Sequence, residues 1–367
     1  MIIKNGLIFQ KSGTFEPGDL YVQNHTIISP LDYCDDGVIV DAGGCYVIPG
    51  LIDIHTHGAF GCDFCDASDA SLSTIASYER SIGVTTFCPT SMTLPFSQLC
   101  DIFATVKNHT DTQDQAHIAG INMEGPFISH KKKGAQKDSC IVSPDIEMFQ
   151  KLNDISGNNI RITTIAPEED HAMDFIRTLS HQVCISLGHS DADYETALAA
   201  FSAGASHVTH LFNAMPPFHH RDTGIVGAAT DSNHVMVEVI CDGIHISPSM
   251  IRSIFQLFDS SNIIFISDSM RATGMEDGTY ELGGQTVYKT GNHALLADGT
   301  LAGSVTNLFD CVKSAVSFGI PLETALLCAT RNPARSIGIY HQTGSLSIGK
   351  KADILLVDRQ LNLKKVL

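Results

Sequence analysis

Basic residues are few in this sequence: 23 Lys and Arg stand against 40 Asp and Glu, which gives a formal net charge of −17 at pH 7. This balance argues against nucleic acid as a partner, because a protein that binds a phosphate backbone needs an excess of clustered Lys and Arg. A small anionic ligand stays open, since it needs only a local cluster of cations.

The sequence also lacks segments that would direct the chain to a membrane. Residues Met1 to Gly6 have neither the charged start nor the apolar run of a secretory signal. No uninterrupted apolar run approaches the length needed to cross a bilayer. We therefore expect a cytoplasmic protein that does not bind membranes.

Two common cofactor or metal motifs are missing or incomplete. No Gly-x-Gly-x-x-Gly follows the first strand expected in the central part of the chain, so a dinucleotide-binding domain is not indicated. Cys62-x-x-Cys65 has the spacing of a zinc knuckle or a redox motif, but no second such pair completes a zinc site. The eleven cysteines are scattered, which favours reduced, buried thiols over a disulfide framework.

The two ends of the chain have the composition of short strands joined by turns. Residues 1–47 carry short apolar runs punctuated by Gly and Asn, and residues 337–367 end in the apolar run Ile354 to Val357. Neither end alone offers enough surface for a core. We therefore expect both ends to pair in one small β-sandwich domain, with a large domain at residues 48–336 inserted between them.

The central part alternates apolar runs with amphipathic helical segments. The helical segments include 71–82, 144–152, 170–181 and 194–203. Eight runs are candidate strands: Leu51–His55, Thr85–Pro89, Ile118–Met123, Arg161–Ala166, Val183–Leu187, His207–Leu211, Val235–Ile240 and Ile263–Ser267. Eight strand–helix repeats predict an α/β fold, a (β/α)8 TIM-like barrel.

Metal-ligand residue types stand at the ends of six of these eight strands. In such barrels the chemistry lies at the carboxyl ends of the strands. His55 and His57 project to one face, because residues two apart in a strand point the same way. The full set comprises His55 and His57, Glu124, His189, His210, Asp242 with His245, and Asp268. So many such residues at one edge predict a common metal site.

Imidazoles with a carboxylate suit Zn²⁺, which we expect, and also Fe²⁺, Mn²⁺ or Co²⁺. Glu124, His189 and His210 would supply three ligands and leave room for a water, as in catalytic zinc sites. His55 and His57 could hold a second ion with Glu124 bridging, so one or two ions are expected. Asp268 then fits as the general base toward a water activated by the metal, and afterwards as the acid. The predicted chemistry is hydrolytic.

These residues together resemble the amidohydrolase superfamily and, within it, the N-acetylglucosamine-6-phosphate deacetylase family. The matching motifs span nearly the whole chain: Pro49–Gly58, Glu124–Phe127, Lys132–Ala135, Leu187–Ser190, Thr209–Pro216, Asp242–His245, Ser267–Ser269, Asp298–Ser304 and Gly349–Asp353. The resemblance implies a barrel with a small β-domain and Asp268 as acid and base. It also implies that the metal is bound by His55, His57, Glu124, His189 and His210. It also implies the deacetylation of an amino-sugar phosphate.

The resemblance further implies which residues bind the substrate. Asn213, Ala214, Arg221 and His245 would contact the sugar phosphate, with Arg221 reaching in from the neighbouring subunit of a homodimer. Arg221 and His245 make sense as local cations on a chain of negative charge. Leu301, Ala302 and Gly303 would line the pocket for the acetyl methyl group, and Ala135 and Asp242 complete the implied substrate site.

One position departs from the family pattern. After Lys132–Ala135 the family usually has a His that is implied to polarise the substrate carbonyl, and here the residue is Gln136. A Gln amide donates a hydrogen bond but carries no charge, so it should stabilise an oxyanion less strongly. A second ion could take over part of that role, or the substrate could differ.

Three alternatives stay open from the sequence. The substrate could be a galacto rather than a gluco sugar. The chain could be another amidohydrolase that needs no phosphate, such as an N-acyl-amino-acid deacylase or a cyclic-amide hydrolase. It could also be a non-catalytic scaffold, although such a relative would be expected to have lost some ligands.

Overall fold

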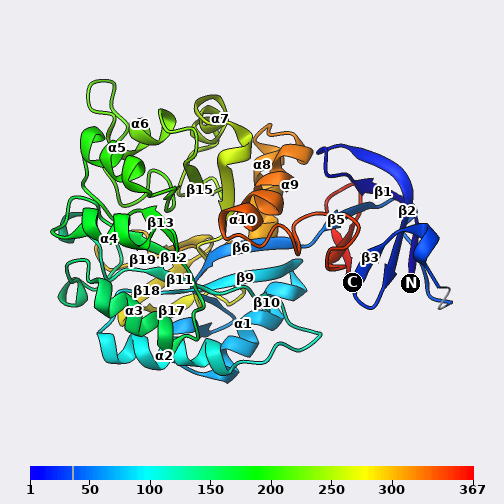
Figure 1. Cartoon of the computed structure of the whole chain (residues 1–367), viewed down its shortest axis with the longest axis horizontal. Coiled ribbons are helices and arrows are strands. Elements are labelled where there is room, and N and C mark those ends of the chain that lie inside the picture. Colours follow the sequence, from blue (N-terminus) through cyan, green and yellow to red (C-terminus); the bar gives the residue numbers. More distant parts are fainter. Residues whose placement is uncertain (35–36) are drawn as a thin grey trace.

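The computed structural model describes residues 1–34 and 37–367. Figure 1 shows a large α/β part and, beside it, a small β-sheet part in which both termini lie. The orange helices α8 (Leu308–Ser317), α9 (Leu322–Ala329) and α10 (Arg331–Ser336) stand on the side of the large part that faces the small one.

Strands from both chain ends form the small part. Its seven-stranded sheet has the order β21-β20-β5-β1-β2-β3, and β4 also pairs with β1. The strands are β1 (Ile2–Phe9), β2 (Phe15–Gln23), β3 (Thr26–Ile28), β4 (Ile39–Asp41), β5 (Tyr46–Pro49), β20 (Ile354–Val357) and β21 (Leu363–Val366). The strands of the expected sandwich are thus hydrogen-bonded into one sheet, and Ile3, Val22 and Leu356 contribute to its common core. The division at residues 47/48 and 336/337 stays a prediction.

The large part is a barrel of parallel strands, as predicted. Its strands are β6 (Leu51–Thr56), β9 (Val84–Ser91), β11 (Ile121–Glu124), β12 (Ile160–Ile165), β13 (Cys184–Leu187), β14 (His207–Val208), β15 (Met236–Ile240) and β16 (Ile263–Ile266). They are neighbours in this order. The ring closes where β6 meets β16, through a parallel bridge between Thr56 and Ser269 and a 2.9 Å hydrogen bond from Asp268 N to His55 O.

A helix follows or precedes each barrel strand. These helices are α1 (Asp69–Ser81), α2 (Phe96–Asn108), α3 (Ile146–Ile155), α4 (Ala172–Leu179), α5 (Tyr194–Ala203), α6 (Gly224–Thr230) and α7 (Pro248–Leu257), followed by α8. α5 illustrates why they form: Asp193 caps its first turn by accepting a hydrogen bond from Thr196 N, while Ala197, Ala200 and Phe201 face the core.

Two predicted strands are interrupted in the structure. The run Ile118–Met123 divides into β10 (His117–Ile118) and β11, because Gly120 between them has φ of +143° and approaches Asn159 O too closely for any Cβ. The run His207–Leu211 leaves the sheet after Val208, where the chain turns toward His210.

Two small sheets lie outside the barrel and the terminal sheet. β7 (Gly58–Ala59) pairs with β8 (Cys62–Asp63), and β17 (Gly278–Leu282), β18 (Gln285–Thr290) and β19 (His293–Leu295) form an antiparallel meander. The eleven cysteines are free thiols, Cys62 and Cys65 among them, but the expectation that they are buried holds only for Cys88, Cys241, Cys311 and Cys328.

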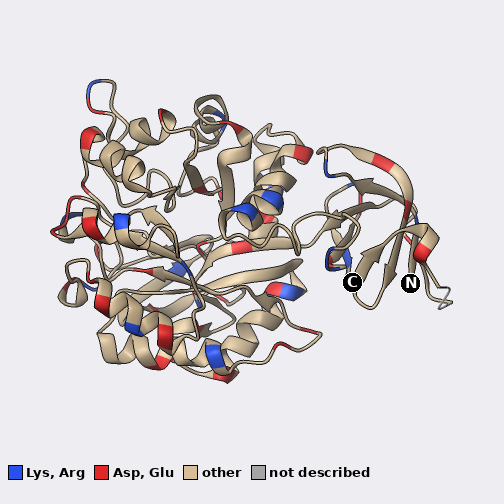
Figure 2. Ribbon diagram, viewed as in Figure 1, with Lys and Arg blue, Asp and Glu red and all other residues tan. Residues whose placement is uncertain are grey.

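Charge is spread over the molecule. In Figure 2 the Asp and Glu residues of the described chain lie on helices, strands and loops, in both parts, with Lys and Arg among them. Within the described residues, the longest apolar helical stretches fall short of what a membrane crossing requires.

Candidate active site

Five of the predicted ligands and Asp268 meet at the carboxyl end of the barrel. His55 and Glu124 lie near the ends of β6 and β11, and His57 follows β6. His189, His210 and Asp268 each come two residues after their strand ends, at β13, β14 and β16 respectively. All six residues are buried, the most exposed being Asp268 at 7%.

The first group consists of Glu124, His189 and His210. Oε1 of Glu124 lies 3.1 Å from His189 Nε2 and 3.0 Å from His210 Nε2, and the two ring nitrogens are 3.0 Å apart. The three donor atoms of this group thus converge on one point.

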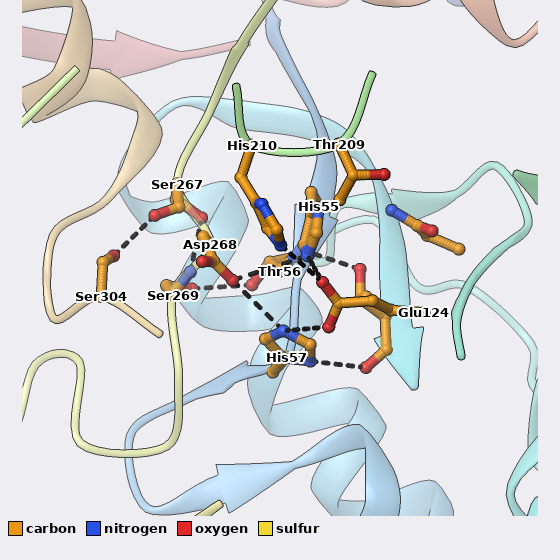
Figure 3. A network of polar contacts seen from close by, with 12 residues as sticks. His55, Thr56, His57, Glu124, Thr209, His210, Ser267, Asp268, Ser269 and Ser304 are labelled. Carbon is orange, nitrogen blue, oxygen red and sulfur yellow. Dashed lines mark hydrogen bonds and ion pairs between the residues drawn. The ribbon is translucent and has the colours of Figure 1, made fainter. Parts of the chain in front are cut away.

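The second group consists of His55, His57 and the same Glu124. His55 Nε2 lies 3.4 Å from Glu124 Oε1, and His57 Nε2 lies 3.4 Å from Glu124 Oε2. Asp268 Oδ1 faces both rings, at 3.5 Å from His55 Nε2 and 3.2 Å from His57 Nε2. Figure 3 shows His55, His57, His210, Glu124 and Asp268 pointing toward a common centre.

Most of the histidines are oriented by a partner on their outward nitrogen. Nδ1 of His55 lies 2.9 Å from Glu238 Oε2, Nδ1 of His57 lies 3.1 Å from Thr90 O, and Nδ1 of His189 lies 3.0 Å from Lys132 O. Because these partners are acceptors, each Nδ1 carries the proton and each Nε2 presents a lone pair inward.

This arrangement fits a divalent cation. Inward lone pairs of imidazoles and carboxylate oxygens repel one another at about 3 Å unless a positive charge lies between them. The Nε2 atom of His55 is buried and has no hydrogen-bond partner, which is what a metal-ligating atom requires. Histidine and carboxylate ligands of this kind suit divalent transition metals.

The electrostatics of the cluster point the same way. Burial lowers the pKa of His55, but the charges of Glu238 and Glu124 outweigh burial and hold that pKa well above its ordinary value. Burial likewise raises the pKa of Glu124, yet the nearby imidazoles of His55 and His189 hold it well below its ordinary value. The carboxylates thus stabilise a positive charge between them. A metal ion would compete with protons for the same imidazole nitrogens and carboxylate oxygens.

Three of the site residues have strained backbones. His189, His210 and Asp268 have φ of +48°, +29° and +51°, in the region that residues with a Cβ seldom adopt. Such conformations persist where the surrounding structure holds them, and they occur often at functional sites. Here they turn each side chain inward just after its strand ends.

The cluster opens into a pocket of about 380 Å³. Seven of the residues implied for substrate binding line it: Ala135, Gln136, Asn213, Ala214, His245, Leu301 and Gly303. Met92, Lys131, Lys132, Met215, Leu282 and Thr300 line it as well, and the sequence had not singled them out as pocket residues.

Three other expected substrate residues lie elsewhere. Asp242 stands behind His245, with its Oδ2 2.7 Å from His245 Nδ1. Ala302 is fully buried, and its backbone N donates to Ala294 O. Arg221 is exposed in a turn bridged by His219 and Asp222, away from the residues that line the pocket of its own chain.

Glu238 is a site residue that the sequence reasoning missed. It lies in β15, is fully buried, and accepts hydrogen bonds from His55 Nδ1 and from His210 N at 3.1 Å. It therefore links the two ligand groups from behind. The available signal was a lone carboxylate in the otherwise apolar run Val235–Ile240.

Comparison with known proteins agrees with this geometry. The model of the family described as "Amidohydrolase family" matches residues 46–367. The N-acetylglucosamine-6-phosphate deacetylase of Bacillus subtilis (strain 168) is 40% identical over 317 residues, which cover 85% of this chain and 80% of the relative. That of Vibrio furnissii is 39% identical over 350 residues, covering 94% and 88%.

A solved structure extends the similarity to the whole fold. The crystal structure of N-acetylglucosamine-6-phosphate deacetylase from Pasteurella multocida superimposes with a TM-score of 0.93 at 29% identity. The match covers 100% of this chain and 97% of that one.

Proposed function

We propose that this chain, which belongs to the amidohydrolase family and within it to the N-acetylglucosamine-6-phosphate deacetylases, hydrolyses N-acetylglucosamine 6-phosphate to glucosamine 6-phosphate and acetate. The observation that carries the proposal is the convergence of five metal-ligand side chains and Asp268 beside one pocket. A non-catalytic scaffold has no need of this complete set.

The ligands of a divalent ion in this proposal are Glu124, His189 and His210. His55 and His57, with Glu124 shared, would hold a second ion. A bound divalent ion lowers the pKa of water from about 15.7 to about 7 and polarises a carbonyl oxygen. We expect Zn²⁺, and Fe²⁺, Mn²⁺ or Co²⁺ suit the same donors.

Asp268 is the acid and base in this reaction. Burial raises the pKa of its carboxyl, but the contact with the His57 ring and the charge of His55 outweigh burial and hold the pKa below its ordinary value. The carboxylate accepts a proton from the water whose oxygen attacks the acetamide carbon. When the C–N bond breaks, Asp268 gives this proton to the sugar nitrogen, so that acetate and a free amine leave.

The pocket lining suits the two ends of the substrate. Leu301 and Gly303 offer a small surface for the acetyl methyl group, with Ala302 packed behind them. Asn213, Ala214 and His245 would contact the sugar and its phosphate. Asp242 fixes the ring of His245 by a hydrogen bond. Burial lowers the pKa of His245, but the hydrogen bond and the negative charge of Asp242 outweigh burial and raise it. A protonated His245 would offer the phosphate a positive charge.

In this proposal, Arg221 binds the substrate phosphate in the pocket of a second protomer. We propose a homodimer in which Arg221 of one protomer reaches the phosphate bound by its partner, since its turn is exposed and remote from its own pocket. We also propose that the enzyme works in the cytoplasm.

Acetate release from purified protein tests the activity. The protein is freed of metal, reloaded with Zn²⁺, and given N-acetylglucosamine 6-phosphate, N-acetylgalactosamine 6-phosphate, N-acetylglucosamine or an N-acetyl amino acid. We expect the highest kcat/KM with the first compound. Preference for the galacto sugar would correct the substrate, and equal rates without phosphate would contradict the proposal.

Mixed dimers test the contribution of Arg221. Arg221→Ala should raise KM for the phosphorylated sugar about 10-fold, since it removes a charge-assisted contact worth about 1.5 kcal/mol. Dimers that combine an Arg221→Ala protomer with an Asp268→Asn protomer should recover one complete site and low KM. Failure to recover would show that Arg221 does not act across the interface.

A further inference from the structure

Gln136 is held on both ends of its side-chain amide by protein groups. Its Oε1 accepts a hydrogen bond from Thr93 N at 2.7 Å, and its Nε2 donates to Glu124 Oε2 at 2.6 Å. The backbone N of Thr93 can only donate, so the amide oxygen must face Thr93 and the amide nitrogen must face Glu124. Gln136 is 2% exposed.

The amide has little left to offer a substrate. The nitrogen carries two hydrogens: one is given to Glu124, and the nitrogen also lies 3.7 Å from Met92 Sδ. A ring at this position, as in the usual family motif, could turn an N–H toward a substrate carbonyl. The amide of Gln136 is committed instead to a carboxylate of the ligand cluster.

The carboxylate that Gln136 contacts is the one shared by both ligand groups. Oε1 of Glu124 faces His189 and His210, while Oε2 faces His57. Rotation of this carboxylate about its last bond would misplace both oxygens at once. A donor fixed on Oε2 removes this freedom, and a hydrogen bond to a charged acceptor is among the stronger kinds.

We propose that Gln136 is a positioning residue, which fixes the shared carboxylate of Glu124 for metal binding rather than contacting the substrate carbonyl. This inference rests on the proposed function only in assuming that the cluster binds a divalent cation. Gln136 is itself held in place by Thr93, which follows β9, and its backbone N donates to Lys133 O at 2.9 Å. Gln285 of β18 donates to the neighbouring carbonyl of Ala135 from the other side.

Zinc affinity of the metal-free protein tests the proposal. Gln136→Met keeps the length of the side chain but removes both polar groups, and Gln136→Ala removes the side chain beyond Cβ. Each variant is titrated with Zn²⁺ in competition with a chromophoric chelator. We expect the dissociation constant for Zn²⁺ to rise about 10–100-fold in both, which is the usual effect of losing a partner of a metal ligand.

Gln285→Met is the matched control, because it makes the same replacement in the same region without touching Glu124. Its zinc affinity should equal that of the unaltered protein. An equal loss of affinity in this control would overturn the proposal, since loop position and not the Gln136 amide would then set the affinity. Circular dichroism and thermal unfolding show that each variant is folded.

Kinetics at saturating Zn²⁺ separate the two roles of Gln136. A positioning role predicts that Gln136→Met regains most of its kcat once the metal is saturating, with KM for N-acetylglucosamine 6-phosphate unchanged. Normal zinc affinity with a lasting loss of kcat would assign Gln136 to the substrate and refute the proposal. Absence of deacetylation in the unaltered protein would count against the proposed function alone, because the zinc titration needs no substrate.

Discussion

The two ends of the barrel interior are built from the same strands but have opposite chemistry. The carboxyl end gathers His55, Glu124 and Asp268, with inward donor atoms and strained backbones. The interior core is apolar: Ile54, Ile162 and Ile266, from strands on different sides of the ring, contribute to one cluster that Ala334 and Ile337 close from the region of α10. Ile54 and His55 are even adjacent in sequence.

This difference separates stability from function along each strand. Burying a branched aliphatic side chain stabilises the fold by about 1.5–3 kcal/mol. Gathering several ionisable groups in a buried cluster costs free energy unless a cation compensates it. The stability gained in the apolar core therefore offsets the free-energy cost of the buried ionisable groups at the carboxyl end. A change in the core should lower stability and spare activity, and a change at the carboxyl end should do the opposite.

Replacing Asp268, the proposed acid and base, should show this separation of stability from function most strongly. Asp268→Asn should lower kcat by a factor of about 10²–10⁴, because no group is left to accept and return the proton. The thermal midpoint should change little, since Asn keeps the size of the Asp side chain. Acetate release and calorimetry measure the two effects; a retained kcat, or a fall in the midpoint that explains the lost activity, would break the comparison.

A cavity in the apolar core should lower stability and leave activity unchanged. Ile264 of β16 is fully buried in this cluster. Ile264→Ala should lower the free energy of unfolding by about 2–5 kcal/mol, while kcat per folded molecule stays unchanged. Urea unfolding followed by fluorescence and by activity checks both. A strong loss of kcat at full stability would show that the core sets the geometry of the site more directly than we argue.

Removal of the metal should destabilise the catalytic end alone. Zinc at about 100 times its dissociation constant should add roughly 2.7 kcal/mol to the stability of the metal-free protein. The same increment is expected in Ile264→Ala if the two ends act independently. Thermal unfolding with and without Zn²⁺ in both proteins measures it, and unequal increments would reveal coupling between the ends.

Glu238 is a buried carboxylate beneath the site and sharpens the comparison further. Glu238→Gln keeps an acceptor for His55 Nδ1 but removes the charge, so zinc affinity should fall about 10-fold. Glu79 of α1 offers a control: it is a buried carboxyl whose pKa burial raises well above the ordinary value, and it is not among the ligand groups. Glu79→Gln should leave zinc affinity unchanged; an equal loss would mean that any buried charge matters.

Much of the fold and most of the site followed from local patterns. Apolar runs such as Ile263–Ser267 predicted strands because a buried parallel strand needs apolar residues on both faces. His55, Glu124 and Asp268 could be grouped because the carboxyl ends of parallel strands share one edge of a barrel. The break at Gly120 was not predictable, since it depends on how closely the backbone O of Asn159, the residue before β12, approaches.

The sequence by itself determined the order of the strands, the candidate metal ligands at their ends and the apolar residues beneath them, because these depend on residue type and on short-range periodicity. Only the tertiary structure decided that Glu238 stands behind His55 and that the amide of Gln136 is committed to Glu124 rather than free to meet a substrate. Such contacts join residues 12 to 183 positions apart. They depend on the closure of the barrel and the path of its loops, which no local pattern encodes.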